Sequence, residues 1–315
     1  MKSKEYSFIR YLSAKKSVDD RALNQRVWEQ LAFKLSSVDQ TELLQVLEVG
    51  AGIGTMVERL LEKGMLRRVN YLGIDAEIEN SEHAQMRLAA WGEAGGFQIS
   101  KNAQQVTLSR PGQQARVSFK TCDLFDFAAQ EHGQRRWDLL VAHAFLDLMD
   151  IPATLPKLFG LLKKRGLFYF TMNFDGLTIL QPTIDLKLDE LIPDLYHRSM
   201  DQRRVKGSLS GDSRAGRHLF THLTAAGGEI LEAGSSDWIV YPEKSGYRQD
   251  EAYFLHFILH TIEQELRGHP ELDQANFLSW IKQRHAQVER GELVYIAHQL
   301  DFLGRLSREQ LLTDK

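Results

Sequence analysis

The sequence contains a single cysteine, Cys122, and no long apolar run. One cysteine excludes an intramolecular disulfide and favours a reducing compartment. No stretch reaches the roughly 18 consecutive apolar residues that a membrane-spanning helix needs, and the amino-terminal sequence lacks the apolar centre of a signal peptide. We therefore expect a soluble cytoplasmic protein with no membrane partner.

The chain also lacks a large excess of charge of either sign. It has 39 Lys and Arg against 42 Asp and Glu, a formal net charge of −3, so no overall positive field attracts nucleic acid. A local basic groove remains an alternative. The histidines show no ligand spacing joined to a carboxylate, and we expect no metal. The composition, 43% hydrophobic and 26% charged over 315 residues, is that of a globular protein with one large or two small domains.

Short apolar segments alternate with helical patterns in the first half of the chain, which predicts a parallel α/β sheet. We expect strands at 45–49, 70–75, 117–122, 138–143 and 167–173, and helices at 54–63, 81–91 and 155–164. A helix over 18–36, capped near Asp19 or Asp20, precedes them. A hairpin that turns at Pro111 and Gly112 leads into the third strand, because the sequence alternates on both sides of that pair.

The second half of the chain departs from this alternation. Residues 178–210 have a helix-like middle and form an insertion after the fifth strand. A helix follows, with Asp212 or Ser213 as its N-cap and Gly227 or Gly228 at its end. Then come a strand near 229–241, two helices at 250–266 and 275–290, and a final strand within 291–304. We expect seven core strands and no linker between domains.

Three glycines follow the first strand at alternate positions. The segment EVGAGIGT places Gly50, Gly52 and Gly54 between strand and helix, two residues after Glu48. Glycine at such a turn is by itself unspecific. Dinucleotide oxidoreductases use G-x-G-x-x-G, whose third glycine position is Thr55 here. The G-x-G-x-G pattern after an acid resembles motif I of the class I S-adenosylmethionine-dependent methyltransferases, in which small residues let the ligand lie against the backbone.

The following strand ends extend this resemblance. YLGIDAE ends with Asp75, placed to accept the ribose hydroxyls; an acid that caps the next turn is the alternative. KTCDLFDF puts Asp123 and Leu124 past the third strand, which looks like the methyltransferase position beside the adenine. A dinucleotide enzyme has no regular use for an acid there. WDLLVAHAFLDLMD is similar to motif IV, which passes under the methyl donor.

The resemblance covers roughly residues 46–173 and implies a fold and a cofactor. The fold is a doubly wound seven-stranded α/β sheet of order 3-2-1-4-5-7-6, with the last strand antiparallel and helical insertions after strands 5 and 6. The cofactor is S-adenosylmethionine, held by Glu48, Gly50, Gly52, Gly54, Asp75, Ala76, Asp123, Leu124 and His143. The single domain 1–315 then comprises an N-terminal helical cap (1–44), a cofactor-binding half (45–175), a lid-like insertion (176–212) and closing strands (213–315) with a helical insertion at 249–290.

The sequence after the fourth strand bears on the methyl acceptor. Methyltransferases of bases or glutamine carry an Asp/Asn-Pro-Pro-Tyr/Phe motif there, which AHAFLDLMD lacks. We expect a small-molecule acceptor, methylated at O, N or C by in-line displacement. A base is needed only if the acceptor carries a proton.

Polar residues at the ends of the fourth and fifth strands and in the insertion are the candidates for handling the acceptor. Those for catalysis are His143, Asn173, Asp175 and His197, and those for acceptor binding are Asp147, Tyr196, Arg214 and Arg217. His143 equally suits a backbone contact to the cofactor. Tyr196 and His197 equally suit surface or packing positions.

Basic residues suggest two finer hypotheses. Arg214 and Arg217 fall in the first turn of a helix, where the macrodipole disfavours cations, so a bound anion would explain them and make the acceptor acidic. A local pair with Asp212 is the alternative. The preceding insertion adds Arg203, Arg204 and Lys206. The amino-terminal segment carries Lys15, Lys16 and Arg21, which suits a lid formed with residues 178–210 over the cofactor; a solvated basic run is the alternative.

Two functions of other classes stay open. The chain could bind S-adenosylmethionine without transferring its methyl group, as a sensor or assembly partner. It could also be an NAD-dependent oxidoreductase. Mass spectrometry of the purified protein for bound S-adenosylmethionine, S-adenosylhomocysteine or NAD separates the three.

Overall fold

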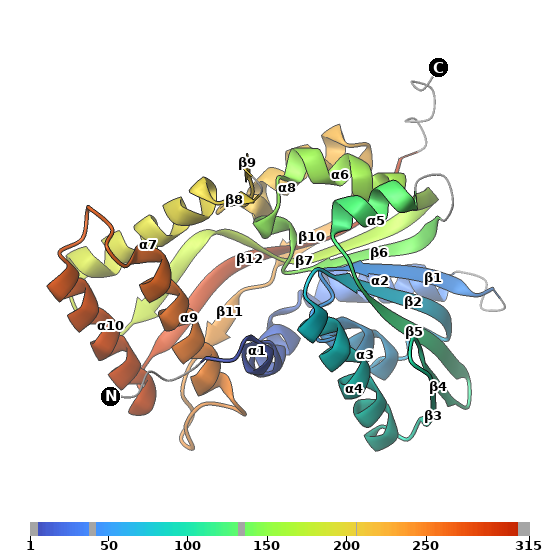
Figure 1. The fold of residues 1–315 in the computed structure, drawn as a ribbon, viewed down its shortest axis with the longest axis horizontal. Coiled ribbons are helices and arrows are strands. Elements are labelled where there is room, and N and C mark those ends of the chain that lie inside the picture. Colours follow the sequence, from blue (N-terminus) through green and yellow to red (C-terminus); the bar gives the residue numbers. More distant parts are fainter. Residues whose placement is uncertain (1–5, 38–41, 132–135, 206, 308–315) are drawn as a thin grey trace.

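A large sheet organises the chain, whose residues 6–37, 42–131, 136–205 and 207–307 are described by a computed structural model. Within these residues ten strands form one sheet in the order β10-β12-β7-β6-β1-β2-β5-β4-β3, with β11 paired to β12 (Figure 1). The strands are β1 (Leu44–Val49), β2 (Arg68–Asp75), β3 (Gln98–Lys101), β4 (Val106–Arg110), β5 (Gln113–Thr121), β6 (Trp137–His143), β7 (Leu162–Gln181), β10 (Gly228–Ser235), β11 (Trp238–Val240) and β12 (Val294–Leu306). A separate hairpin consists of β8 (Arg204–Val205) and β9 (Ser208–Leu209).

The order of the main strands confirms the expected fold class. The seven predicted strands correspond to β1, β2, β5, β6, β7, β10 and β12, and they lie in the order 3-2-1-4-5-7-6. β12 is antiparallel to both of its neighbours, whereas β5, β2, β1, β6 and β7 are mutually parallel. This is the topology of the class I methyltransferases. The direction of strand addition reverses between β1 and β6, the place where open α/β sheets bind ligands.

An antiparallel edge extends the sheet beyond β5. β4 and β5 form the expected hairpin around Pro111 and Gly112. The sequence does not predict β3, which pairs with β4, because its residues QISK are mostly exposed and show no apolar alternation.

Helices cover both faces of the sheet (Figure 1). α2 (Gln25–Ser36), α3 (Thr55–Glu62) and α4 (Ile78–Ala94) pack on one face, and α5 (Leu124–Gln130), α6 (Ile151–Gly160) and α8 (Ala215–Ala225) pack on the other. Successive strand residues point to opposite faces, so Val46 and Leu47 belong to different buried clusters. Among the helices within the described ranges, none combines the length and the apolar character needed to cross a membrane.

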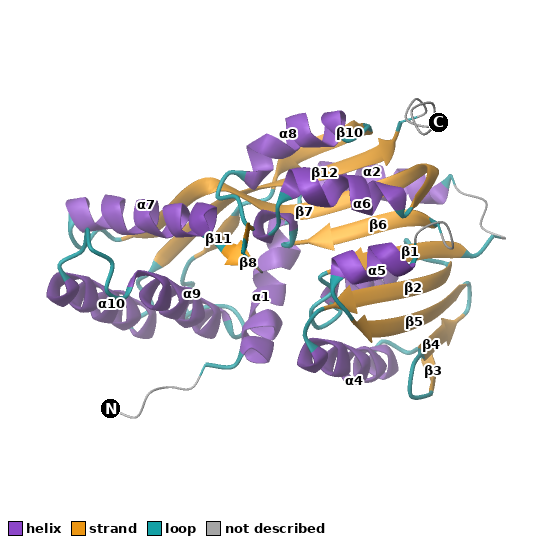
Figure 2. Cartoon of the chain, turned by 45° about the horizontal axis from the view of Figure 1, so that its top comes forward, coloured by secondary structure: helices purple, strands orange, loops and turns teal. Residues whose placement is uncertain are grey.

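A second group of helices lies at the far end of the longest strands. β7 and β12 continue past the rest of the sheet to α7 (Leu186–Gln202), α9 (Glu251–Leu266) and α10 (Gln274–Glu289) (Figure 1, Figure 2). α9 and α10 confirm the helices predicted at 250–266 and 275–290. A separate apolar cluster, with Phe254, Trp280 and Tyr295 among its buried members, holds this helical group together.

The prediction for the fifth strand is too short. β7 spans Leu162–Gln181 rather than 167–173, so the insertion begins later and consists mainly of α7. A register shift between β7 and β12 coincides with a left-handed φ of +57° at Met172. Such a bulge interrupts the local alternation. Backbone pairing with β12, which is distant in the sequence, continues β7 on both sides of this bulge.

The amino-terminal prediction is wrong in one respect. Instead of one helix over 18–36 there are two, α1 (Phe8–Ala22) and α2, and neither Asp19 nor Asp20 is an N-cap. Asn24 caps α2 by accepting the Val27 N–H at 3.1 Å, and its own N–H donates to Asp301 at 2.8 Å. This contact with β12 separates the two helices, and no pattern in the neighbouring sequence predicts it.

Candidate active site

The glycine loop after β1 has a backbone that only glycine adopts readily. Gly50, Gly52 and Gly54 have φ values of +63°, +53° and +77°. Gly54 is the N-cap residue of α3. The Gly52 N–H donates to the Asp75 carboxylate at the end of β2, at 2.8 Å. This hydrogen bond joins the loop to the neighbouring strand, beside the reversal point of the sheet.

Asp75 is largely satisfied by the protein itself. Oδ2 accepts from Gly52, and Oδ1 accepts from the Glu77 N–H and from Asn80 Nδ2, both at 3.0 Å. A carboxylate offers about four acceptor positions. The geometry therefore leaves room for about one further donor on Oδ2. Asp75 thus combines the two roles considered for it, a cap of the next turn and an acceptor for a ligand hydroxyl.

The surface of the glycine loop is partly covered by the chain's own side chains. A Cβ atom on Gly50 would lie 2.3 Å from the Phe145 ring, and one on Gly52 would lie 3.5 Å from Leu12 of α1. The other side of the loop is packed, because a Cβ on Gly54 would meet Phe119 at 2.8 Å. Gly50 and Gly52 thus form a cradle, and Leu12 and Phe145 are its neighbours.

Glu48 lies beneath this loop but does not bond its backbone. The residue is 2% exposed, and it accepts a hydrogen bond from the Tyr71 hydroxyl at 2.7 Å. Burial raises the pKa of Glu48 to about 8, although Tyr71 and Arg59 act in the opposite direction. The carboxyl is therefore mostly protonated at neutral pH.

Asp123 caps the helix after the third core strand. Its Oδ1 accepts from the backbone N–H groups of Phe125 and Asp126, at 2.8 and 3.3 Å. Leu124 is buried next to it, and Ala76, after β2, is exposed. The strand ends at which the cofactor residues are predicted thus lie side by side along β1, β2 and β5.

A buried carboxylate of α1 reaches the end of β6. Asp19 accepts from Lys15 at 2.6 Å, from His143 Nε2 at 2.9 Å and from Trp238 Nε1 at 2.9 Å. Burial alone would raise the pKa of Asp19, but Lys15, His143 and Arg59 together lower it. Asp19 is therefore ionised. The sequence shows no sign of this cluster, because Lys15 and Asp19 resemble a solvated i,i+4 pair.

His143 is held at both ring nitrogens. Because Asp19 can only accept, Nε2 carries the proton, and Nδ1 accepts from the Thr171 hydroxyl at 2.7 Å. Burial lowers the pKa of His143 to about 4. The imidazole is thus neutral and fixes α1 against β6 and β7. In this arrangement neither nitrogen is available to take a proton from a substrate.

Two predicted acceptor-side residues have unsatisfied oxygens. Asp147, in the short 3-10 helix η1 (Leu146–Leu148), and Asn173, in β7, each have a buried Oδ1 without a partner in the part of the chain that the structure describes. Asn173 Nδ2 donates to the Leu300 carbonyl at 2.9 Å. Burial raises the pKa of Asp147 to about 6.

The insertion contributes α7 to this side. His197 Nε2 lies 3.0 Å from the Thr178 hydroxyl, and its ring packs against Phe174 with a centroid distance of 5.0 Å. Burial lowers the pKa of His197. Tyr196 is partly buried among the apolar residues of the helical group. His197 thus has a hydroxyl and an aromatic ring as neighbours, and its catalytic role stays a prediction.

The two arginines of α8 have local explanations. The Arg217 side chain donates to Asp175 Oδ1 at 2.8 Å, and the same oxygen accepts the Arg217 backbone N–H. The helix starts one or two residues later than expected, with Arg214 at the N-cap and exposed. Asp212 accepts from the Arg214 backbone at 2.8 Å and contacts His218, so the expected pair of Asp212 with an arginine side chain is replaced by Asp175. Lys206, expected to add positive charge here, lies outside the described residues.

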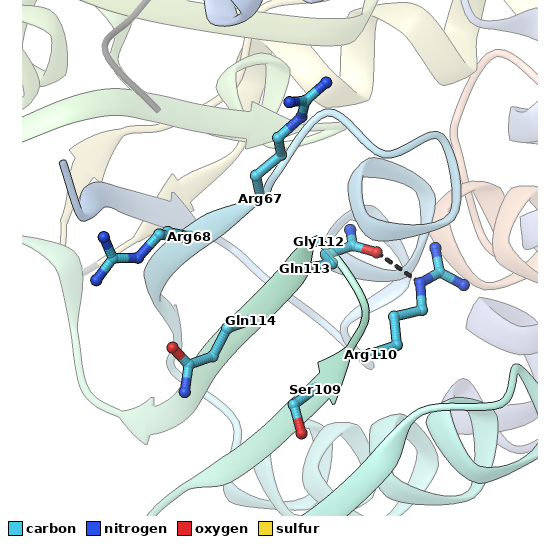
Figure 3. Close-up of a pocket in the computed structure, with 7 residues that line it drawn as sticks. All are labelled: Arg67, Arg68, Ser109, Arg110, Gly112, Gln113 and Gln114. Carbon is cyan, nitrogen blue, oxygen red and sulfur yellow. Dashed lines mark hydrogen bonds between the residues drawn. The ribbon is translucent and has the colours of Figure 1, made fainter. Parts of the chain in front are cut away.

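A pocket of about 480 Å³ lies at the opposite end of β2. Figure 3 shows the side chains of Arg67, Arg68 and Arg110 pointing away from one another. Arg110 is held by Gln113 at 2.8 Å. The guanidinium groups do not converge on a common ligand position, so the carboxyl edge is the better candidate site. Within the described ranges no group of three or more His, Cys, Asp or Glu side chains could hold a metal ion.

The solved structures that resemble this chain share little of its sequence. No family model and no curated protein sequence matches the chain. A cyclopropane synthase from Mycobacterium tuberculosis is 10% identical, with a TM-score of 0.43 over 96% of this chain and 100% of that chain. A phosphoethanolamine N-methyltransferase from Haemonchus contortus, in complex with phosphomonomethylethanolamine and S-adenosylhomocysteine, is 11% identical, with a TM-score of 0.43 over 96% and 59%. An S-adenosylmethionine-dependent methyltransferase from Methanosarcina mazei is 13% identical, with a TM-score of 0.42 over 84% and 92%. Likenesses at this level assign neither ligand nor activity to this chain.

Proposed function

We propose that the carboxyl edge of the sheet binds S-adenosylmethionine and that the protein transfers its methyl group to a small molecule. The observation that carries the proposal is the left-handed glycine loop, joined by Gly52 to Asp75 at the reversal point of a sheet with methyltransferase strand order. When bound, the cofactor supplies an electrophilic methyl group on a sulfonium centre.

The residues present fit this cofactor at two points. The Phe145 ring covers Gly50, so Gly52 is the glycine whose backbone a ligand can approach, and Asp75 Oδ2 retains one acceptor position for a ribose hydroxyl. Asp123 and Leu124 would border the adenine. Leu12 and Phe145 lie next to the cradle and would exclude water from the bound donor. On this view α1 is a closed cover over the site.

Calorimetry tests the proposal. We expect the wild-type protein to bind S-adenosylhomocysteine and not NAD. Asp75→Ala should weaken binding by about 1.5–2 kcal/mol, roughly tenfold to thirtyfold, because a charge-assisted hydrogen bond is lost and the loop loses its tie. Glu79→Ala, an exposed acid in the first turn of α4, is the matched control and should bind normally. Tight NAD binding, or unchanged affinity in Asp75→Ala, would reject the assignment.

One observation favours a non-catalytic alternative. His143, the candidate base nearest the cofactor, is neutral and occupied by Asp19 and Thr171. A protein that binds S-adenosylmethionine as a sensor needs no base. Incubation with labelled methyl donor and a metabolite extract distinguishes the two: labelled product indicates transfer, and binding without product indicates a sensor.

In this structure Arg214 and Arg217 do not support an acidic acceptor. The Arg217 side chain pairs with Asp175, and the start of α8 leaves Arg214 exposed at the N-cap, so neither position requires a bound anion.

A further inference from the structure

Polar groups without partners gather between α1, η1, α7 and β12. The hydroxyls of Tyr11, Tyr196 and Tyr295 make no hydrogen bond to any residue of the described ranges, and Asp147 Oδ1 is buried without a partner there. Buried polar groups in folded proteins are nearly always paired. Asp147 Oδ1 is such a buried group, and the three hydroxyls beside it are unbonded without being fully enclosed. An oxygen that needs a donor, next to hydroxyls that open onto accessible space, points to a missing ligand. We call these four residues the tyrosine–aspartate cluster.

The rings of Tyr11, Tyr196 and Tyr295 belong to one apolar cluster, and their polar ends influence one another electrostatically. Tyr11 stacks on Phe254 and Phe257 of α9, with centroid distances of 5.7 and 4.1 Å. The charge of Asp147 acts on the hydroxyls of Tyr11 and Tyr196, and Tyr295 lies within the same electrostatic range of both tyrosines. Burial raises the pKa of all three hydroxyls, so they stay protonated.

The cluster adjoins the glycine loop along two chain segments. Leu12, next to Tyr11, lies beside Gly52, and Phe145, two residues before Asp147, lies against Gly50. A ligand among the tyrosines would thus be a neighbour of a ligand on the loop. This is the position that a methyl acceptor requires if the proposed function is correct.

The chemistry of the cluster selects a cation. An ionised carboxylate with aromatic rings around it binds an ammonium group by charge-assisted hydrogen bonds and by cation–π attraction. Lys15 and Arg203 are the cations that act on Asp147. Lys15 is committed to Asp19 at 2.6 Å, and Arg203 is exposed at the end of α7. An anionic ligand would be repelled by the Asp147 carboxylate.

We propose that the tyrosine–aspartate cluster binds the acceptor through a protonated amine, so that the acceptor is a small organic amine, whichever of its atoms is methylated. This inference rests on the proposed function. It goes further by naming the substrate class and the residues that select it.

A probe series of equal size and different charge tests the inference. Butylammonium, butanol and butyrate are titrated into the protein in the presence of S-adenosylhomocysteine, with binding followed by saturation-transfer NMR and calorimetry. We expect butylammonium to bind at least tenfold tighter than butanol, and butyrate to bind most weakly. Asp147→Asn should reduce the butylammonium affinity about tenfold and leave butanol unchanged. Asp194→Asn, an exposed acid on α7, is the matched control.

Acidification gives a second readout. Besides Asp147, the charged and titratable groups near this position are Lys15 and Tyr11 on α1, Tyr196 on α7, Tyr295 on β12, and Arg203 and Asp212. The tyrosines keep their protons between pH 5 and 8, because burial raises their pKa above an already high ordinary value. Protonation of Asp147 around its pKa of about 6 should therefore weaken butylammonium binding as the pH falls from 7 to 5, with butanol unaffected.

The possible results separate this inference from the proposed function. Equal affinity for butanol and butylammonium, preference for butyrate, or normal butylammonium binding by Asp147→Asn would overturn it. If Asp147→Asn does not fold, Tyr196→Phe replaces it, and unchanged butylammonium affinity in that variant would also overturn the inference. Amine binding tests the cluster without any turnover. Failure to bind S-adenosylhomocysteine rejects the proposed function instead.

Discussion

The two sides of the carboxyl edge differ in how far the protein satisfies its own polar groups. On the glycine-loop side, Asp75 and Asp19 each accept three hydrogen bonds and Glu48 is paired with Tyr71. On the tyrosine side, Asp147 and Asn173 each keep a buried oxygen without a partner within the described residues.

This difference shows two ways of preparing a binding site. A satisfied network is rigid and holds a backbone shape, here the cradle at Gly50 and Gly52. In an unsatisfied network, a buried polar group without a hydrogen bond costs free energy, and a ligand with complementary donors removes that cost. The first suits a cofactor bound largely by shape, and the second suits selection of an acceptor by its chemistry.

Removing the Asp19 carboxylate of the glycine-loop side should have the largest effect. Asp19→Asn takes the negative charge from a cluster that includes the buried Lys15 and His143, and breaking a buried ion pair costs about 3–5 kcal/mol. We expect a loss of this order in the free energy of unfolding, measured with urea. Asp194→Asn, in an exposed pair with Arg198, should change it little. If both variants lose the same amount, the cluster does not hold α1 in place.

A methyl group on the cradle should have the next largest effect. Gly50→Ala adds the strain of a left-handed alanine, about 1–2 kcal/mol, to a collision with Phe145 at 2.3 Å. We expect a total destabilisation of about 2–4 kcal/mol in urea denaturation. The control is Gly112→Ala, at φ +76° with nothing within 4 Å of the new atom, which should show the strain alone. Equal losses in the two variants would mean that Phe145 moves aside at no cost.

The pH dependence of stability tests the buried acid of the cradle. Glu48 has a higher pKa in the folded protein, about 8, than its usual 4.5. The folded state therefore binds its proton more tightly, and Glu48 makes stability fall as the pH rises from about 4.5 to about 8. Glu48→Gln should reduce this fall, with a gain on the order of 1–3 kcal/mol at pH 8 relative to pH 5. Urea titrations at both pH values measure it; an unchanged slope would show that the carboxyl ionises freely in the folded protein.

The smallest expected change in stability distinguishes Arg217 in α8 from Arg214 at its N-cap. Arg217→Gln leaves the buried Asp175 carboxylate without its guanidinium partner, and should lower the free energy of unfolding by about 1 kcal/mol. Arg214→Gln changes an exposed residue and should have no measurable effect on stability. Neither substitution should alter S-adenosylhomocysteine affinity in calorimetry. Strong destabilisation by Arg214→Gln would show that this side chain has a partner that the structure does not display.

The sequence by itself determined the features that depend on short stretches of chain. The alternation of short apolar segments with helical patterns located the core strands. The spacing of Gly50, Gly52 and Gly54 predicted a turn, and all three residues have left-handed φ values in the structure. These features follow from backbone sterics and side-chain period, which neighbouring residues settle among themselves.

Only the tertiary structure decided what those features contact. Asp19 is buried because His143 and Trp238, 124 and 219 positions away, converge on it, and nothing in the local charge pattern distinguishes it from a solvated acid. The contact of Phe145 with Gly50 and the electrostatic influence of Asp147 on Tyr11 likewise depend on how α1 and η1 dock on the sheet. Burial and electrostatic environment are properties of the assembled neighbours, so the chemistry of these groups emerges only when distant segments meet.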